Sequence, residues 1–495
     1  MNAFDYFFQT SGNLGKNLIL GPSETVSYKD IYQKSLLVAR YLHNTFGENN
    51  NIIIISPNSS FFLIAYLGIM KSGNVCVPLN PVIEADNLKY ISDSIQCRYA
   101  FVPGNITGKY ALDAQHIIDE SAVEKICEQA AQVDSWVLPD HFDERRLNQI
   151  LFTSGSTGLP KGVQLSHKNL IANTESILKY LQLTENDIIE VVLPFFYCYG
   201  LSLLHTHLRV GGSLVLNNSF MFLGSVFNDL KKYRCTGFSG VPTHFQILLR
   251  KSKIFKSLDL PDLRYVTQAG GKLHNVFIRE FIEAFPRIRF FVMYGQTEAT
   301  ARLSYLPPEM LNEKMGSIGK GIPDVTLDVL NEIDEPVKPD EVGEIVAKGD
   351  NIMTGYLNDP AANAQTLRNG WLYTGDMARK DEDGFIYLTA RKKEIIKVGG
   401  RRVSPKEIEE VIVSVPEVVD CTIEGVYDEL LGEAIKATVV LQDSVDKEQG
   451  KEIIISVCRK RLAQYKIPQL FHFEEKLTIS STGKKVKGAG KEVKG

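Results

Sequence analysis

The stretch Leu-Phe-Thr-Ser-Gly-Ser-Thr-Gly-Leu-Pro-Lys-Gly, residues 151–162, follows an apolar segment with the composition of a buried strand. Its last ten residues contain four hydroxyl side chains, three glycines and one lysine. Glycines let a backbone approach a polyanion closely, and exposed N–H groups, hydroxyls and Lys161 can surround phosphate oxygens. The spacing differs from the G-x-x-x-x-G-K-[ST] of a Walker loop. These residues indicate a phosphate-binding loop after a strand, although a flexible surface loop can have the same composition.

Strand-like and helix-like segments alternate on both sides of this loop. Before it we expect strands at 51–56 and 74–78 and helices at 59–71 and 84–93. After it we expect strands at 190–193, 213–216, 237–240, 265–268 and 289–293, and helices at 226–233, 243–250 and 274–285. Such alternation is typical of parallel sheets covered by helices.

The composition changes near residue 316, where Gly, Pro and Asp separate short strands at 326–330 and 343–348. After Arg391 a Lys-rich segment leads into helices at 405–413 and 447–462 and strands at 418–425 and 434–441. The predicted fold class is α/β. A large N-terminal domain, residues 1–391, would contain two helix-covered, mostly parallel sheets and a small β-barrel-like unit at about 316–390. A small mobile α+β domain, residues 392–495, would follow.

Length and composition limit the classes of function. A chain of 495 residues with 44% hydrophobic and 23% charged residues is typical of a soluble globular protein with two to four units. Its net charge of −4 gives no electrostatic case for a nucleic-acid partner. The longest apolar run, Phe61–Met70, is shorter than the roughly 20 residues of a membrane span, and the first residues do not resemble a signal peptide. The seven cysteines show no paired C-x-x-C spacing, so we expect a cytoplasmic protein.

Further motifs follow the loop in order. Tyr-Gly-Gln-Thr-Glu-Ala at 294–299 comes directly after a predicted strand, where open α/β sheets place their ligands. Tyr-Thr-Gly-Asp lies at 373–376, Arg-Lys-Lys-Glu-Ile-Ile-Lys-Val-Gly-Gly-Arg at 391–401, and Ser-Thr-Gly-Lys-Lys at 481–485. Together these motifs resemble the signature of the adenylate-forming superfamily, which contains acyl- and aryl-CoA ligases, amino-acid adenylation domains and beetle luciferases. The resemblance covers about residues 25–487.

The resemblance implies ATP and Mg²⁺ as cofactors. Tyr294 would stack on adenine, Thr297 would contact the α-phosphate, and Glu298 would hold Mg²⁺, a hard cation that prefers oxygen ligands. Asp376 would accept hydrogen bonds from the ribose hydroxyls, since a carboxylate offers two acceptor oxygens, and Arg391 would contact ribose or phosphate. The residues expected around ATP are Thr153, Ser154, Gly155, Ser156, Thr157, Gly158, Lys161, Gly271, Tyr294, Gly295, Gln296, Asp376 and Arg391.

The family's chemistry implies two steps with different catalytic groups. Lys484 would bridge the substrate carboxylate and the α-phosphate during adenylation. The family usually has an apolar residue after this lysine, whereas this chain has Lys485, so either lysine fits the motif. The C-terminal domain would then rotate about a hinge at Lys393. That rotation would bring Lys397 into the site with Gly399 and Gly400, whose small size lets a pantetheine arm approach.

The segment Pro194–Gly200 should begin a helix that lines the acyl pocket. Its pocket residues would be Tyr197, Cys198, Tyr199 and Gly200, and the facing wall would be Gln268, Ala269 and Gly270. No acidic residue occurs between Glu190 and Asp229, which argues against an α-amino acid substrate. Apolar and aromatic lining favours an aryl or short-to-medium acyl acid, although Phe195, Phe196 and Tyr199 could equally be core residues.

The predicted function is ATP-dependent activation of a small carboxylic acid to acyl-AMP, followed by transfer to a thiol. The thiol is that of coenzyme A or of the phosphopantetheine of a separate carrier protein. Three alternatives stay open at this stage: a stand-alone amino-acid or acyl loader of a carrier protein, a luciferase-like oxygenase, and a non-catalytic nucleotide-binding protein. The sequence leaves the acid, the pathway and the oligomeric state open.

Overall fold

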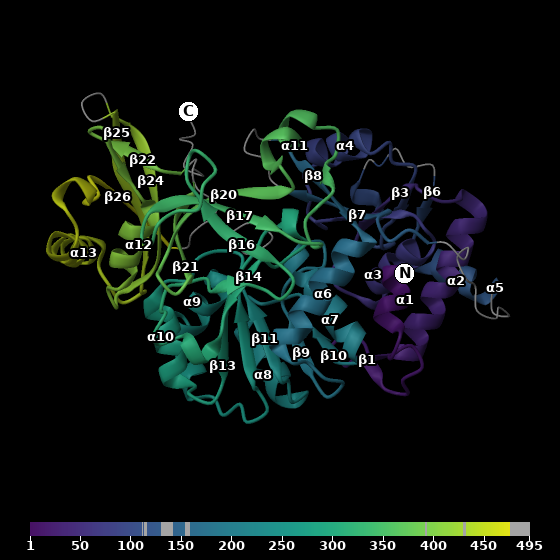
Figure 1. Ribbon diagram of the computed structural model, residues 1–495. Helices are drawn as coiled ribbons and strands as arrows, with labels where there is room; N and C mark the ends of the chain where they lie inside the picture. Colours follow the sequence, from purple (N-terminus) through teal and green to yellow (C-terminus); the bar gives the residue numbers. More distant parts are fainter. Residues whose placement is uncertain are drawn as a thin grey trace.

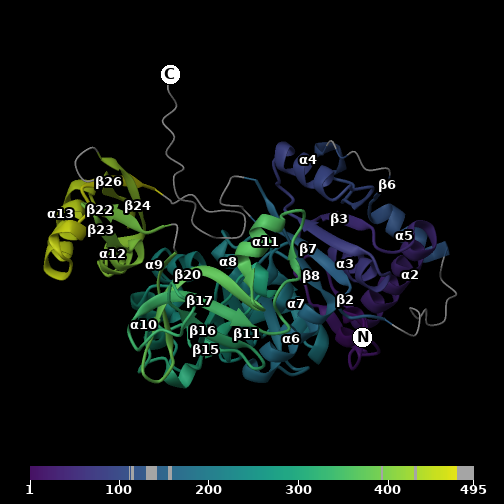
Figure 2. The same ribbon diagram turned by 45° about the horizontal axis from the view of Figure 1, so that its top comes forward.

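The computed structural model describes residues 1–110, 112, 116–129, 142–153, 159–391, 394–428 and 432–475. The fold has two large sheets, a smaller antiparallel sheet and a C-terminal unit with a sheet of its own (Figures 1 and 2). Within the described ranges, no helix is both long enough and apolar enough to cross a bilayer.

The first large sheet has the strand order β18-β8-β7-β4-β3-β5-β6. Its parallel strands are β3 (Asn51–Ile55), β4 (Val75–Leu79), β5 (Tyr99–Phe101), β6 (His116–Ile118) and β7 (Leu147–Thr153), and its antiparallel strands are β8 (Lys161–Ser166) and β18 (Gly355–Tyr356). Strands β3 and β4 are almost continuously apolar and buried, as expected for parallel strands covered on both faces. The helix α3 (Ser60–Lys71) is buried nearly all round, so the apolar run Phe61–Met70 is a core helix.

The second large sheet has the order β15-β14-β13-β12-β11-β9-β10-β1-β2. Its central parallel strands are β9 (Ile188–Val191), β10 (Ser213–Leu216), β11 (Gly237–Gly240), β12 (Tyr265–Gln268) and β13 (Arg289–Tyr294). Side chains alternate between its faces. Val215, Phe238 and Val266 pack under α8 (Leu223–Lys232), α9 (Pro242–Arg250) and α10 (Asn275–Ala284). Leu214 and Tyr265 face the core shared with α6 (His167–Leu181) and α7 (Cys198–Val210).

This part of the chain also contains the outer strands of the second sheet, at its two ends, and further helices. They are α1 (Ala3–Phe8), β1 (Asn17–Ile19), β2 (Val26–Ser27), α2 (Tyr28–Phe46), α4 (Ala85–Ser94), α5 (Glu120–Gln129), β14 (Ser304–Leu306) and β15 (Lys320–Gly321). The smaller antiparallel sheet contains β16 (Thr326–Leu330), β17 (Val342–Lys348), β19 (Leu367–Arg368), β20 (Trp371–Lys380) and β21 (Ile386–Arg391), with α11 (Pro360–Thr366) beside it.

The C-terminal unit has its own sheet and core. Its elements are β22 (Ile396–Val398), β23 (Arg401–Val403), α12 (Pro405–Val413), β24 (Val418–Asp428), β25 (Gly432–Leu441), α13 (Lys447–Arg461) and β26 (Leu470–Glu474). Both views place this unit beside α9 and α10. Gln246 donates to the Asp420 carboxylate at 2.9 Å, and Arg250 donates to the carbonyl of Pro416 at 2.8 Å. The predicted α/β class, with a large first domain and a small second one, is confirmed, whereas the exact boundary near residue 391 stays a prediction.

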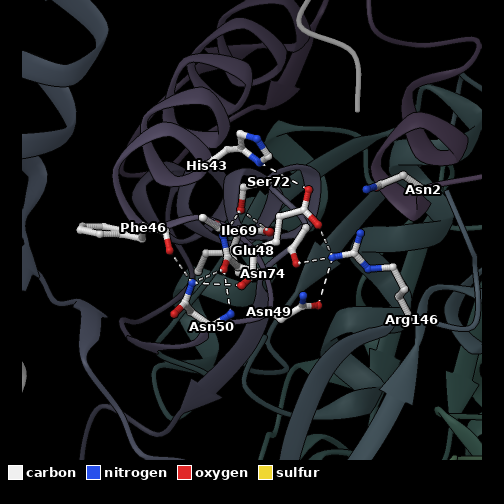
Figure 3. Close-up of polar contacts among 12 residues, drawn as sticks. Asn2, His43, Phe46, Glu48, Asn49, Asn50, Ile69, Ser72, Asn74 and Arg146 are labelled. Carbon is white, nitrogen blue, oxygen red and sulfur yellow. Dashed lines mark hydrogen bonds and ion pairs between the residues drawn. The ribbon is translucent and has the colours of Figure 1, made fainter. Parts of the chain in front are cut away.

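A polar cluster joins the amino ends of three strands of the first sheet (Figure 3). The Arg146 guanidinium, directly before β7, donates to Glu48 at 2.7 Å, to Asn49 at 3.1 Å and to the Gly73 carbonyl at 3.1 Å. The Asn74 carboxamide, directly before β4, accepts from the backbone N–H of Asn50 at 2.9 Å. The cluster therefore fixes β7 relative to β3 and β4, and β7 leads at its other end into the predicted phosphate loop.

Candidate active site

The motif at 294–299 forms a tight reversal at the carboxyl end of β13. Thr297–Ala299 is a single 3-10 turn, and the chain then returns antiparallel to β13 as β14. A Cβ at Gly295 would lie 2.0 Å from the carbonyl oxygen of Ala301. Glycine is therefore required at 295 for this reversal.

The side chains of Tyr294, Asp376 and Arg391 meet although they are far apart in sequence. The Tyr294 hydroxyl donates to Asp376 Oδ2 at 2.8 Å, and Arg391 Nε donates to Asp376 Oδ1 at 2.9 Å. Burial, and then the Asp376 charge, raises the pKa of Tyr294 well above its ordinary value, so its hydroxyl stays a donor. Each carboxylate oxygen keeps a second acceptor position, which fits a ligand that presents hydroxyl groups.

Glu298 and Lys161 meet at the ring of Tyr356. The Tyr356 hydroxyl donates to Glu298 Oε1 at 2.8 Å, and Lys161 Nζ lies 5.1 Å from the centroid of the Tyr356 ring. Burial and the Glu298 charge raise the pKa of Tyr356, which keeps this donor protonated. Lys161 also pairs with Asp359 at 3.0 Å. The lysine of the predicted phosphate loop and the predicted metal ligand thus both contact Tyr356.

The residues around Glu298 fit Mg²⁺ on donor chemistry. Tyr356 uses one of the two carboxylate oxygens. Among the residues that the structure describes, no group of three or more His, Cys, Asp or Glu side chains could hold a metal ion. A Mg²⁺ ion at Glu298 would therefore depend on phosphate oxygens and water for its other ligands, the usual manner of Mg²⁺ binding with nucleotides.

The start of α7 lies against the reversal after β13. Thr297 Oγ1 contacts Cys198 Sγ at 3.5 Å. Gly200 is required for the first turn of the helix, since a Cβ there would lie 2.1 Å from the Pro194 carbonyl oxygen. Tyr199 is buried with its hydroxyl against Thr267 Oγ1 at 2.8 Å, and Phe195 is also fully buried.

The facing wall after β12 is held by its own side chain. Gln268 Nε2 donates to the carbonyl oxygens of Ala269 at 3.2 Å and Gly271 at 2.8 Å, so its carboxamide orders the loop. Gly270 has φ +84°, which favours glycine. The Tyr197 hydroxyl lies 3.7 Å from the position of a Cβ on Gly270, so the two predicted walls of the acyl pocket are in contact at Tyr197 and Gly270.

The same loop continues into a contact with the C-terminal unit. Glu410, on α12, accepts from the backbone N–H of Asn275 at 2.9 Å and contacts His274 Nδ1 at 3.0 Å. Lys272 Nζ lies 3.6 Å from the same carboxylate. Burial alone would raise the pKa of Glu410, but the His274 hydrogen bond and the charges of His274 and Lys272 outweigh it and lower the pKa to about 2. The pocket wall is therefore tied to α12 by a partly buried carboxylate.

Several predicted residues do not join this constellation. Lys397, Gly399 and Gly400 lie on the exposed hairpin of β22 and β23, and a Cβ at either glycine would meet nothing within 4 Å. In this arrangement the hairpin does not enter the site. Ser154, Gly155, Ser156, Thr157, Gly158, Lys393, Lys484 and Lys485 lie outside the described residues, whereas Thr153 ends β7 beside Lys161.

The structure adds residues to which the sequence assigned no role. Tyr356 and Asp359 hold Glu298 and Lys161, and Glu410 caps the pocket loop. Arg302, 3% exposed, packs its guanidinium 4.0 Å from the centroid of the Tyr199 ring. No local motif marks these residues, because the contact that gives each of them its place in the site is made with a residue distant in sequence.

Family models match two parts of the chain. Residues 9–357 match the model described as AMP-binding enzyme, and residues 407–484 match AMP-binding enzyme C-terminal domain. An oxalate–CoA ligase of Arabidopsis thaliana is 32% identical over 448 residues, which cover 88% of this chain and 86% of that protein. A feruloyl-CoA synthase of an Amycolatopsis species is 32% identical over 444 residues, 89% of this chain and 88% of that protein.

Solved structures share the whole architecture. An o-succinylbenzoate CoA synthetase of Bacillus subtilis, bound to its acyl-adenylate intermediate, has a TM-score of 0.83 at 25% identity and covers 98% of this chain and 96% of its own. An anthranilate CoA ligase bound to anthranoyl-AMP has a TM-score of 0.88 at 22% identity, covers 98% and 95%, and shows the shared fold. With the paired carboxylate at Asp376, the acidic Glu298 and the two matched models, the chain belongs to the AMP-binding enzyme family and is an AMP-forming acid–thiol ligase.

Proposed function

We propose that this enzyme activates a small organic carboxylic acid with ATP and Mg²⁺ and passes the acyl group to the thiol of coenzyme A. One observation carries the proposal: Tyr294, Asp376 and Arg391 form a hydrogen-bonded triad beside Thr297 and Glu298, at the end of a central parallel strand. Ligands of open α/β sheets bind at this edge.

ATP would lie between the triad and Lys161. Asp376 would accept from the ribose hydroxyls with its free acceptor positions, and Tyr294 would cover the adenine. The ribose is thereby positioned by a carboxylate whose direction Arg391 and Tyr294 already fix. Ordered before ATP binds, this geometry avoids part of the entropy cost of binding.

In the first step an oxygen of the substrate carboxylate attacks the α-phosphorus of ATP. The bond from that phosphorus to the bridging oxygen breaks, and pyrophosphate leaves. Glu298 would hold Mg²⁺, which when bound neutralises the charge of the phosphate oxygens. Thr297 and the catalytic lysine at 484 would donate to the α-phosphate and keep the attacking oxygen in line. The site needs no covalent nucleophile for this step.

In the second step the thiolate of coenzyme A attacks the acyl carbon, and AMP leaves as its phosphate oxygen takes the bond electrons. Lys397, Gly399 and Gly400 would approach the thiol at this stage. They lie on an exposed hairpin, where a Cβ at either glycine would meet nothing within 4 Å, and this exposure supports a rotation of the C-terminal unit about Lys393 between the steps. Such domain movement is an ordinary switching mode.

The acid and the acceptor are the open parts of this proposal. The acids named by the relatives include oxalate, ferulate and long-chain fatty acids, so likeness alone selects none. The aromatic start of α7 favours a small or aryl acid here. We propose coenzyme A as the acceptor, since the relatives are named as CoA ligases; a carrier-protein pantetheine is the second candidate. The seven free cysteines support a reducing compartment such as the cytoplasm.

Pyrophosphate exchange with a panel of acids tests the first step. Each acid is incubated with Mg²⁺, labelled pyrophosphate and ATP, and then with coenzyme A or a phosphopantetheinylated carrier protein, with products read by mass spectrometry. We expect acid-dependent exchange and a CoA thioester. Asp376→Ala should remove the exchange, whereas Asp443→Ala, which removes only an exposed carboxylate paired with Lys251, should not. Thioester formed only on the carrier protein would contradict the CoA assignment.

A further inference from the structure

The turn that carries the predicted metal ligand Glu298 has a strained backbone. Thr300, two residues further along, has φ +64° and is 5% exposed. Positive φ at a β-branched residue is an outlier, and the Ala301 N–H donates to the Ala299 carbonyl at 2.7 Å across it. Such conformations persist only where the surrounding structure fixes them, and they cluster at functional sites. The contacts that hold this turn therefore bear on the role of Glu298.

Residues 350–356 hold the turn in place. Asn351 contacts it at two points: its carbonyl accepts from Thr300 Oγ1 at 2.7 Å, and its Nδ2 donates to the Arg302 carbonyl at 2.8 Å. The N–H of Met353 donates to the Glu298 carbonyl at 2.9 Å. These bonds fix the backbone of Glu298, but they do not fix the torsions of its side chain.

The Tyr356 hydroxyl fixes that side chain by donating to Glu298 Oε1 at 2.8 Å. The backbone of Tyr356 is held in turn by Asn363, whose Oδ1 accepts from its N–H at 2.6 Å and whose Nδ2 donates to its carbonyl at 3.1 Å. The donor to Glu298 is a neutral hydroxyl, and the Lys161 ammonium is paired with Asp359 at 3.0 Å. The Glu298 carboxylate is thus oriented by a group that leaves its negative charge available for a cation.

We propose that Tyr356 is a positioning residue for the adenylation step: its hydroxyl holds the Glu298 carboxylate in the orientation that binds the Mg²⁺ of Mg·ATP. This inference rests on the proposed function, in which Glu298 holds that ion. Glu298 is only partly buried, so without this hydrogen bond its side chain would have to be ordered each time the metal binds. Tyr356 itself takes no part in bond making.

The test measures nucleotide binding without the acid, so it does not depend on turnover. Equilibrium dialysis with labelled ATP gives a Kd in excess Mg²⁺ and a Kd in EDTA, and the ratio of the two is the metal preference of the enzyme. Tyr356→Phe removes the hydroxyl but keeps the ring that contacts Lys161. Groups that orient a metal ligand typically contribute about 10- to 100-fold to metal affinity, so the metal preference should fall by at least about tenfold. Binding of metal-free ATP should not change, and in pyrophosphate exchange the KM for Mg·ATP should rise while the KM for the acid does not.

Two further variants assign the effect to the contact with Glu298. Tyr387→Phe is the matched control, because the Tyr387 hydroxyl, on β21 of the smaller sheet, donates to the Asp381 carboxylate at 3.2 Å. That variant should keep the full metal preference. Glu298→Gln should lose it, and adding Tyr356→Phe to Glu298→Gln should change nothing further, since two residues that act through one contact are not additive.

Two results would overturn the inference while leaving the proposed function intact. One is an unchanged metal preference in Tyr356→Phe. The other is a Tyr356→Phe variant that binds ATP more weakly by the same factor with and without Mg²⁺, which is the signature of a structural role. A Glu298→Gln variant that keeps the metal preference would instead fail the metal ligand of the proposed function, and this inference with it. If Tyr356→Phe does not fold, Glu298→Asp decides, because it keeps the carboxylate but withdraws it from the Tyr356 hydroxyl; an unchanged metal preference in that variant rejects the inference.

Discussion

The Glu410 carboxylate should control how firmly the C-terminal unit is docked. Glu410→Gln keeps an oxygen for the backbone N–H of Asn275 but presents an amide N–H₂ to His274 and removes the charge near Lys272. Hydrogen bonds to charged groups contribute about 1.5–3 kcal/mol each. A negative charge at a helix N-terminus, here that of α10, adds about 0.3–1 kcal/mol.

We expect the substitution to weaken docking by about 2–3 kcal/mol, or roughly 30- to 150-fold in the ratio of docked to undocked molecules, since about 1.4 kcal/mol is tenfold. Amide hydrogen exchange measures this directly, because the first turn of α10 receives its cap from Glu410. A peptide covering residues 272–280 should exchange faster in Glu410→Gln by about that factor.

Glu407→Gln is the matched control. Glu407 lies on the same helix, but its carboxylate pairs with Lys466 inside the C-terminal unit at 2.7 Å. That variant should leave the exchange of residues 272–280 unchanged. Equal acceleration in both variants, or none in Glu410→Gln, would refute the assignment of docking strength to the Glu410 contacts.

Other predictions follow from the same structure. Because the pKa of Glu410 is lowered from 4.5 to about 2, its contribution to docking should be complete above about pH 4.5 and lost as the pH falls through about 2; hydrogen exchange of residues 272–280 at stepwise lower pH measures the loss, and a loss centred above pH 5 would contradict it. Lys484→Ala should lower acid-dependent exchange by about 10²–10³-fold yet leave thioester formation from supplied acyl-adenylate unchanged. Lys485→Ala should leave both activities unchanged. The reversed pattern would assign the catalytic role to Lys485. Gly295→Ala should destabilise the protein by about 1–3 kcal/mol in urea unfolding, because its Cβ would overlap the Ala301 carbonyl, while Gly224→Ala, with open space at its Cβ, should be neutral or stabilising.

The sequence predicted the central strands of the second sheet closely, and the reason is local. The segments 213–216, 237–240 and 265–268 are short, each contains an apolar or aromatic residue and follows a glycine or a polar residue, and the structure has strands at those residues. The helix at 405–413 was also placed correctly, since Pro405 occupies its first turn. The strand predicted at 190–193 lies at 188–191 instead. Residues 188–193 are apolar apart from Glu190, so the sequence does not mark an end, and the last pairing with β10, Val191 to Leu216, decides where the ladder stops.

The site was predictable only as far as its motifs extend. Tyr294, Asp376 and Arg391 were named from their motifs, and the structure brings them together. The partners of Glu298 and Arg302 were not predictable, because Tyr356 reaches Glu298 from the first sheet and Tyr199 reaches Arg302 from helix α7, about 100 residues earlier in the chain. The wall residue Gln268 was expected in the acyl pocket, but its carboxamide bonds to its own loop. A single sequence does not show which neighbouring group a buried polar side chain will hydrogen-bond.

In the proposed mode of ATP binding, the pairing of Lys161 with Asp359 makes nucleotide binding an exchange of anions. Asp359 divides its carboxylate, with Oδ2 on Lys161 and Oδ1 accepting from the Ala362 N–H at the start of α11. A phosphate that binds Lys161 therefore displaces the Asp359 carboxylate instead of a free salt ion. Asp359 still accepts from the Ala362 N–H, so α11 keeps its N-terminal cap. The attraction gained at this lysine is only the difference between two ion pairs. Added salt screens both pairs alike, so nucleotide affinity at this position is buffered against ionic strength.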